Sequence, residues 1–455
     1  MSATEQALRL PELLLSVFEL IQASGHSLVP IAQVNQVWFD CATSILWRRV
    51  KSRELYRVEK HRRQIYASKL DAICFDGEDG DIHEAFIGLQ FHHIRQINLD
   101  LFDPPRGGLA HLQQYLAPSL QVFNFIGGDL DDEFLLQMAA TCTRLRVICM
   151  NLPGPRVTPS AILSLVSGCE RLEDVNFNDM EGLLSDAIFL HLAGRSNIFR
   201  LTWDTLIPPR LVTRASQETA TPFKDMRVLT TTVTTSSVAW IAQNMTRLSH
   251  LILKLEDTEH DVLRPLPKLQ NLKRIRISFL PTQVLSTESL VGLRSLSKLE
   301  TLDLSTKARG MKVADVRGAN FQNADFEKLL SGLPLLRHLS LVIEASFSLR
   351  VGPMISRNCP LIEECNILKN FDTRLLLAQA PADKPMFPFL QRLNIRRVTM
   401  GRAEENRTLE QSADVLIAAI RRNCPSIKLI IPSETNPYSS LVARRFDSAE
   451  KPADT

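Results

Sequence analysis

The sequence predicts an α/β repeat solenoid of about 14 strand–helix units, preceded by a small all-helical domain. Two observations support this fold class. A short apolar pattern recurs along most of the chain, and the segment ahead of it has apolar residues at helical spacing without that pattern. The chain has 455 residues, of which 45% are hydrophobic and 23% are charged, so it has ample material for a large core.

The recurring pattern is apolar-x-x-apolar-x-apolar, whose last two apolar residues point to one face of a short strand. Successive matches are mostly spaced by the roughly 20–29 residues typical of a leucine-rich repeat. Their first positions are Leu70, Ile94, Leu120, Leu145, Leu172, Ile198, Met226, Leu248, Leu272, Leu299, Leu336, Ile362, Leu390 and Ile427. One unit cannot bury its apolar face alone, so stacked neighbours must share a core. We therefore expect a leucine-rich-repeat solenoid over residues 70–432, with insertions at its two longest steps.

Four cysteines follow the repeat. Cys142, Cys169, Cys359 and Cys424 each lie three residues before the first apolar position of a unit. This resembles the cysteine-containing subtype of leucine-rich repeat. A metal site is the alternative, but recurrence in register favours small buried side chains at helix ends, because free cysteine is commonly buried. We expect no metal and no cofactor.

Residues 1–50 carry a different pattern. Apolar residues at helical spacing predict three short helices between Pro11 and Arg49. The opening Leu10-Pro11, the later Val37-Trp38 and a closing Leu-Trp pair occur in the order typical of an F-box, and the segment resembles the F-box/leucine-rich-repeat family in a fungal-like form. One departure is that Glu12 follows Pro11 directly. A plain helical cap on the solenoid is the alternative.

The resemblance implies that this segment binds a Skp-type adaptor and, through it, a cullin scaffold. So short a segment also has more apolar groups than it can bury, which independently favours a partner. The candidate adaptor-binding residues are Leu10, Pro11, Leu13, Leu14, Val17, Phe18, Leu28, Val37, Trp38 and Trp47.

The remaining segments are assigned as follows. A basic stretch over 51–69 could touch nucleic acid or an acidic patch, but a linker helix that packs Leu55, Val58, Ile65 and Tyr66 onto the first repeat is favoured. Loops are expected near 207–222, 305–325 and 369–388, and a disordered tail over 433–455.

A protein client is expected on the strand side chains that face away from the core. Its candidate residues are Lys254, Arg274, Arg276, Arg392 and Arg396, which make parts of that face basic. Arginine pairs well with carboxylate and phosphate, so the hypothesis is an acidic or phosphorylated peptide. A generic solvated face is the alternative.

Several function classes are disfavoured. The formal net charge is only +3, so general nucleic-acid binding is not indicated. No long apolar run or basic signal segment occurs, which favours a cytoplasmic or nuclear protein without membrane contact. No catalytic or phosphate-binding motif is present, so we expect no enzyme. The main hypothesis is a substrate-recognition subunit of a Skp–cullin–F-box ubiquitin ligase; the alternative is a leucine-rich-repeat scaffold or regulator without a ligase role.

Overall fold

The computed structural model describes residues 10–77, 80–100, 109–180, 182–259, 261–280, 282–306, 308–309, 312–313, 316–343, 351–367, 385–395, 408–432 and 437–448. The chain divides into two compact units, Met1–Thr205 (unit 1) and Leu206–Thr455 (unit 2). Each unit is described by itself. In the described part of the chain, none of the helices has both the length and the hydropathy needed to cross a membrane.

Unit 1 begins with helices. Helix α2 (Pro11–Ala23) has its proline in the first turn, where a missing N–H costs nothing. Helix α3 (Gln36–Leu46) is capped by Asn35, whose side chain accepts from the Trp38 amide. Between them lies only the 3-10 turn η1 (Ile31–Gln33), so the predicted second helix is a single turn.

The sheet starts earlier than predicted. Strand β1 (Arg49–Lys51) pairs in parallel with β2 (Ala72–Phe75), so the first strand precedes Leu70 by about twenty residues. The basic segment between them forms helix α4 (Ser52–Arg57), η2 (Lys60–Arg62) and helix α5 (Arg63–Ala67).

The basic segment packs much as expected. Leu55 and Tyr66 are buried, but Ile65 is 42% exposed, so its predicted packing is wrong. Tyr66 stacks on Trp47 with ring centroids 4.3 Å apart, which joins the N-terminal helices to the first repeat.

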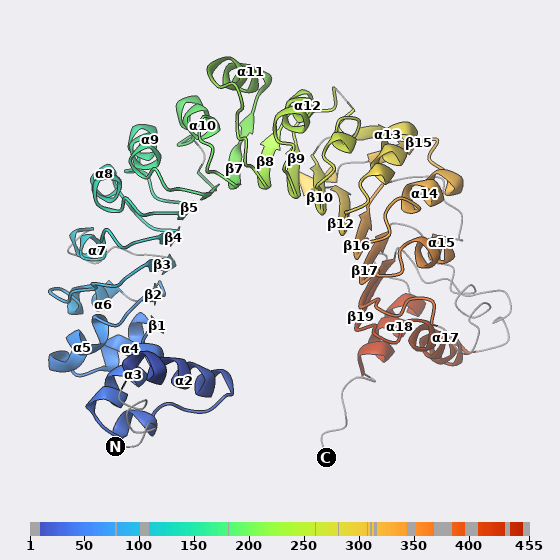
Figure 1. Ribbon diagram of the computed structural model, residues 1–455. Coiled ribbons are helices and arrows are strands. Elements are labelled where there is room, and N and C mark those ends of the chain that lie inside the picture. The colour runs from blue at the N-terminus through green and yellow to red at the C-terminus, as the bar shows by residue number, and fades with distance from the viewer. Residues whose placement is uncertain are drawn as a thin grey trace. The chain divides into compact units, whose positions relative to one another are not determined.

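The rest of unit 1 is a run of strand–helix units (Figure 1). The strands are β3 (Gln96–Asp100), β4 (Val122–Ile126), β5 (Val147–Asn151), β6 (Asp174–Asn178) and β7 (Arg200–Ile207). The helices are α6 (Gly80–Ala85), α7 (Ala110–Gln113), α8 (Asp132–Thr141), α9 (Pro159–Gly168) and α10 (Asp186–Ala193). Figure 1 shows the strands side by side with the helices along one side of them.

Unit 2 continues the same construction. Its main-sheet strands are β8 (Val228–Val233), β9 (His250–Leu255), β10 (Arg274–Phe279), β12 (Thr301–Thr306), β16 (His338–Leu341), β17 (Glu364–Ile367), β18 (Arg392–Ile395) and β19 (Leu429–Pro432). The intervening helices include α12 (Thr235–Asn244), η3 (Leu266–Lys268), α13 (Thr287–Gly292), η4 (Leu293–Ser295), α14 (Asn323–Leu330), α15 (Val351–Asn358) and α17 (Leu409–Asn423).

The predicted repeat register is confirmed in each unit. In unit 1 Ile97 pairs with Phe123, and Phe123 with Ile148. In unit 2 Ile275 pairs with Leu302, and Leu302 with Leu339. Every one of these side chains is at most 2% exposed, so equivalent positions of neighbouring units form the core of a leucine-rich-repeat solenoid.

Two of the three predicted loop segments differ. The expected loop near 207–222 is mostly helix α11 (Pro209–Glu218), which buries Leu211 and Ala215. Within 305–325, β15 (Val316–Ala319) pairs with β11 (Gln283–Ser286) in a separate small sheet, and β13 (Ala308–Arg309) pairs with β14 (Lys312–Val313). The expected loop near 369–388 lies mostly outside the described residues.

The predicted disordered tail also differs. The structure instead has helix α18 (Pro437–Ser448), which buries Tyr438, Val442 and Phe446. Apolar residues at helical spacing explain why this segment packs on its neighbours rather than remaining disordered.

The in-register cysteines are buried at helix ends, as predicted. Cys142, Cys169 and Cys424 are the residues that terminate α8, α9 and α17, and all are at most 1% exposed. The Cys169 thiol donates to the carbonyl oxygen of Cys142, the equivalent residue one repeat earlier, at 3.7 Å. Burial raises the pKa of the Cys142 thiol to about 12 and that of Cys169 to about 11.

Candidate functional site

Unit 2 leaves the strand side that faces away from its helices open, and parallel pairing arranges this open face in two rows. Row A consists of Arg274, Thr301, His338, Glu364, Arg392 and Leu429, one residue from each strand from β10 to β19. Row B lies two residues further along the strands and consists of Arg276, Asp303, Ser340, Asn366 and Asn394. Neighbouring strands lie ~4.8 Å apart, so side chains within a row can contact one another.

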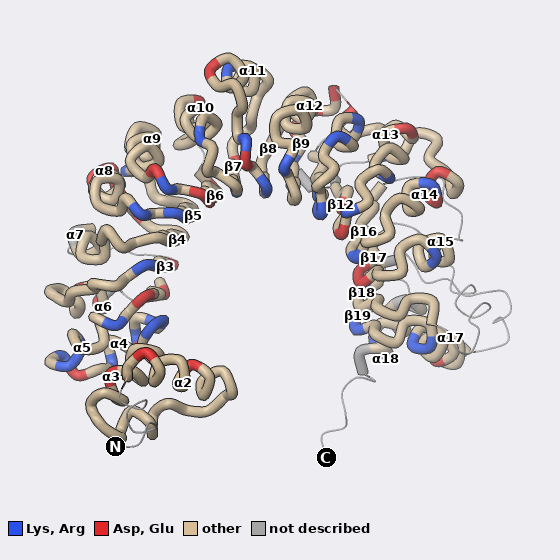
Figure 2. The backbone as a smooth tube through the Cα atoms, viewed as in Figure 1, with Lys and Arg blue, Asp and Glu red and all other residues tan. Residues whose placement is uncertain are grey.

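Row A contains a chain of three polar side chains with Glu364 at its centre. The Glu364 carboxylate lies 3.1 Å from the Arg392 guanidinium on one side and 3.4 Å from His338 Nδ1 on the other. Row B contains a second pair, in which Arg276 Nε donates to Asp303 Oδ2 at 2.8 Å. Figure 2 shows basic and acidic positions interspersed along these strands.

These rows line an open groove with a volume of about 410 Å³, which runs from β10 to β19. Asn366 donates to the Ser340 hydroxyl at 3.1 Å across its floor. Asp303 Oδ1 and Asn394 Oδ1 are buried without a hydrogen-bond partner among the described residues. A surface with fixed charges, amides and two unsatisfied acceptors on a rigid sheet is suited to bind a polar segment of another molecule.

The predicted client-binding residues separate into three groups. Arg274, Arg276 and Arg392 line the groove, so the structure brings these three together. Lys254 lies on β9, outside the groove lining. Arg396 lies outside the described residues.

Sequence reasoning overlooked the acidic partners. Asp303 lies at the strand position next to Arg276 in the adjacent unit and pairs with it. Glu364 lies next to Arg392 in the same way and pairs with that arginine. The signal was present, because residues at one position of successive repeats lie side by side. Three arginines and two carboxylates leave one formal positive charge in the groove, which is therefore mixed rather than strongly basic.

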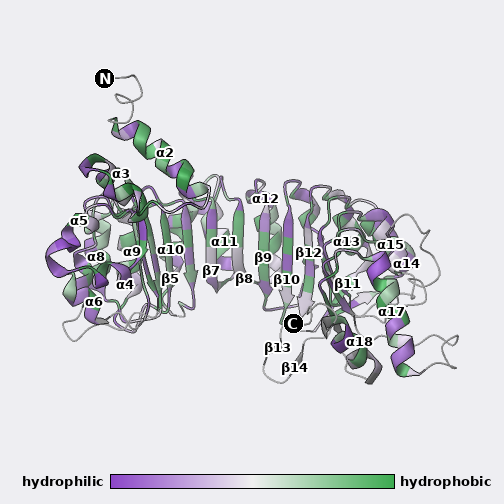
Figure 3. Ribbon diagram, turned by 90° about the horizontal axis from the view of Figure 1, so that it is seen from below, coloured by the Kyte–Doolittle hydropathy of each residue, from purple (hydrophilic) through white to green (hydrophobic). Residues whose placement is uncertain are grey.

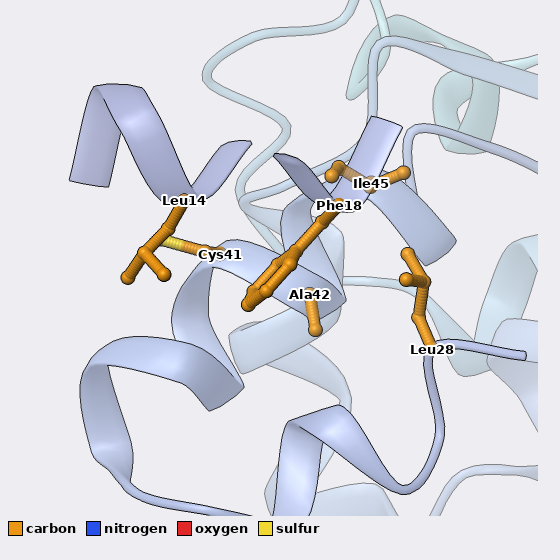
Figure 4. Close-up of a cluster of buried hydrophobic side chains, with 6 residues drawn as sticks. All are labelled: Leu14, Phe18, Leu28, Cys41, Ala42 and Ile45. Atoms are coloured by element: carbon orange, nitrogen blue, oxygen red, sulfur yellow. The ribbon is translucent and has the colours of Figure 1, made fainter. Parts of the chain in front are cut away.

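A second candidate surface is formed by the N-terminal helices, which have a small core of their own (Figure 4). Leu14, Phe18 and Leu28 are each 1% exposed and pack with Cys41, Ala42 and Ile45. Trp38 lies edge-on against Phe18 with centroids 5.4 Å apart. Several side chains assigned to adaptor contact therefore support the fold instead, because three short helices need them as their core.

Three exposed members of the predicted set form a stripe along α2 together with Leu20, which was not predicted. Leu10, Leu13, Val17 and Leu20 are 51%, 47%, 43% and 69% exposed and recur every three or four residues, which places them on one side of the helix. Figure 3 shows hydrophobic positions along α2. Contiguous exposed apolar side chains of this kind mark an interaction surface.

A hollow of about 310 Å³ lies between α2 and α3, lined by Pro11, Leu15, Val37, Asp40, Cys41 and Ser44. Burial favours a raised pKa of Asp40, but hydrogen bonds from Gln36 and Lys69 outweigh it and lower that pKa. The ammonium of Lys69 also donates to the Thr43 hydroxyl at 2.5 Å. These bonds attach α3 to the segment that precedes β2.

Comparisons with known proteins give no family. No family model matches the chain, and no curated protein does. Solved structures that align include an internalin from Listeria monocytogenes (12% identity, TM-score 0.39, covering 86% of this chain and 90% of that one). A Leptospira interrogans leucine-rich-repeat protein aligns at 13% identity and TM-score 0.38, over 80% and 90% of the two chains.

The complex of PEPR1 with AtPEP1 aligns at 15% identity and TM-score 0.41, over 81% of this chain and 50% of that one. These scores are low, so the leucine-rich-repeat architecture rests on the strand register of each unit. None of the comparisons bears on the F-box resemblance or on its fungal-like form.

Proposed function

We propose that this chain is a non-catalytic, leucine-rich-repeat protein-binding scaffold, and that it holds a protein client against the open face of unit 2. The supporting observation is the groove from β10 to β19, which presents charged and polar side chains on a sheet anchored by a buried apolar core. Side chains held in register on a rigid sheet lose little entropy when a partner binds, which favours recognition.

Proximity labelling in cells tests this function. The full chain, fused to a labelling enzyme, is compared with the double variant Ser340→Trp/Asn366→Trp, which fills the groove. Arg294→Glu is the matched control, since Arg294 is exposed on η4, away from the strands. We expect a set of proteins labelled by wild type and control to be lost with the groove variant. If all three label the same proteins, client binding by this face is refuted.

We further propose that the N-terminal helices dock a Skp-type adaptor, which makes the chain a substrate receptor of a cullin ubiquitin ligase in the cytoplasm or nucleus. Two observations favour this: the apolar stripe Leu10, Leu13, Val17 and Leu20 along α2, and the separate hollow between α2 and α3 that Val37 lines. The receptor would act by proximity, holding a client near the ubiquitin-transfer machinery, and would itself do no chemistry.

Co-purification with a Skp-type adaptor separates the two functions. Trp38→Ala is a poor probe because Trp38 packs on Phe18. Val17→Asp and Leu10→Ala/Pro11→Ala alter exposed side chains and should abolish or strongly weaken binding. Ile87→Asp is the matched control, because Ile87 is 58% exposed elsewhere in unit 1. Failure of the wild-type chain to bind the adaptor leaves the scaffold function alone.

A further inference from the structure

The groove of unit 2 has an uneven distribution of unsatisfied groups. Arg276 is neutralised by Asp303, and Arg392 shares Glu364 with His338. The side chain of Arg274, at the β10 end of row A, is exposed and has no hydrogen-bond or ion-pair partner among the described residues. A negatively charged group of a partner could therefore pair with Arg274 without displacing a carboxylate of this chain.

The other end of the groove favours uncharged polar groups. Ser340, Asn366 and Asn394 occupy successive strands in row B and can both donate and accept hydrogen bonds. Asn394 Oδ1 lacks a donor, which a partner's N–H could supply after a small adjustment of the side chain. An additional acidic group at this end would approach the Glu364 carboxylate, which would repel it.

We infer that the groove recognises an extended segment of a partner protein that carries one oxyanion, a carboxylate or a phosphate, seated on Arg274, followed by uncharged polar residues along Ser340, Asn366 and Asn394. The lining residues come from six strands, a span of ~24 Å, which about seven extended residues cover. This inference rests on the proposed client-binding function and narrows its ligand. The sequence alone predicted an acidic or phosphorylated peptide; the groove instead favours a segment that bears a single negative charge.

The first test uses a display library of random dodecamer peptides, panned on the immobilised full chain. We expect enriched peptides with a single acidic residue followed by Ser, Thr, Asn or Gln. Panning on Arg274→Glu should lose this motif, while panning on the control Arg294→Glu should retain it. Enriched peptides with acidic clusters, enrichment unaffected by Arg274→Glu, or the absence of any enriched peptide would each overturn the inference.

The second test measures coupling. One enriched peptide is synthesised with its acidic residue intact, replaced by Gln, or replaced by phosphoserine, and a fourth version carries two extra Glu residues. Binding to the wild-type chain and Arg274→Glu is measured by fluorescence anisotropy. Loss of the oxyanion should weaken wild-type binding by about tenfold to hundredfold, as expected for a charge-assisted bond, and should not weaken binding to Arg274→Glu.

The phosphoserine version tells a phosphate site from a carboxylate site. It should bind more tightly than the carboxylate version if the site prefers phosphate. Tighter binding of the version with two extra Glu would refute single-oxyanion recognition. So would an equal loss of affinity on removing the oxyanion, whether the protein is wild type or Arg274→Glu. The proposed function stands or falls separately, because proximity labelling with the groove-filling variant also detects folded clients that no linear peptide mimics.

Discussion

Phe18→Ala is expected to unfold the N-terminal helices while leaving the repeats intact. Phe18 is 1% exposed, contacts Trp38 edge-on, and belongs to a cluster of six buried residues in the described part of the N-terminal segment. Truncation of a buried Phe costs about 3–5 kcal/mol. A segment of about 40 residues has only a few kcal/mol of stability of its own, so this loss is comparable with the total.

Amide hydrogen exchange resolved by residue is the assay. In Phe18→Ala the amides of α2 and α3 should lose protection, whereas those of β4 to β6 should be unchanged. Val17→Asp is the matched control, because Val17 is 43% exposed and an exposed substitution costs less than about 0.5 kcal/mol. Unchanged protection of α2 in Phe18→Ala, or equal loss in Val17→Asp, would refute the division of this helix into a core side and a docking side.

Four further predictions concern the repeats. Burial raises the pKa of the Cys142 and Cys169 thiols to about 12 and about 11, so at pH 8 iodoacetamide should modify them only after denaturation. The partly exposed Cys74 should react faster in the native state, and labelling of Cys142 in the folded protein would contradict this prediction. Since these raised pKa values favour the protonated thiols, their contribution to stability should be complete below pH ~8.5, the ordinary thiol value, and should decline as the pH rises toward 11–12. Arg195→Ala should lower the free energy of unfolding, measured by urea titration, by about 2–3 kcal/mol. The reason is that the Arg195 guanidinium donates to the carbonyl oxygens of Val166 at 2.8 Å and Cys169 at 3.1 Å, at the end of α9. A loss below ~0.5 kcal/mol would show that water replaces the guanidinium as the donor. Gly332→Ala should lower the thermal midpoint by several degrees, since its Cβ would collide with the backbone carbonyl of Arg294, and an unchanged midpoint would show that the two segments separate easily.

The repeat architecture could be predicted because its signal is local and recurs. The apolar strand residues Ile275 and Ile277 are two positions apart, and Leu302 and Leu304 occupy the same two positions in the next unit. Period-two alternation determines which side chains face the core, and repetition at nearly constant length determines which of them become neighbours. Register, core positions and buried cysteines follow from those two facts.

Side-chain partnerships were decided by the tertiary structure. Arg276 reads as a free cation in the sequence, but the chain places Asp303 at the same strand position one unit later, 2.8 Å from Arg276 Nε. Leu14 and Val17 are both apolar residues of α2. Packing against α3 buries Leu14 but leaves Val17 exposed. Helix α18 has apolar residues at helical spacing in the sequence, but only its packing against α17 and β19 shows that they are buried.

The sequence by itself determined that this protein is a leucine-rich-repeat solenoid with core residues at known positions, because local periodicity dictates burial. Only the tertiary structure decided which charges remain unpaired and which apolar side chains remain exposed, since both depend on neighbours brought together from separate repeats and helices. For this chain those two features are Arg274 in the groove and the apolar stripe on α2, which are the surfaces through which we expect it to act.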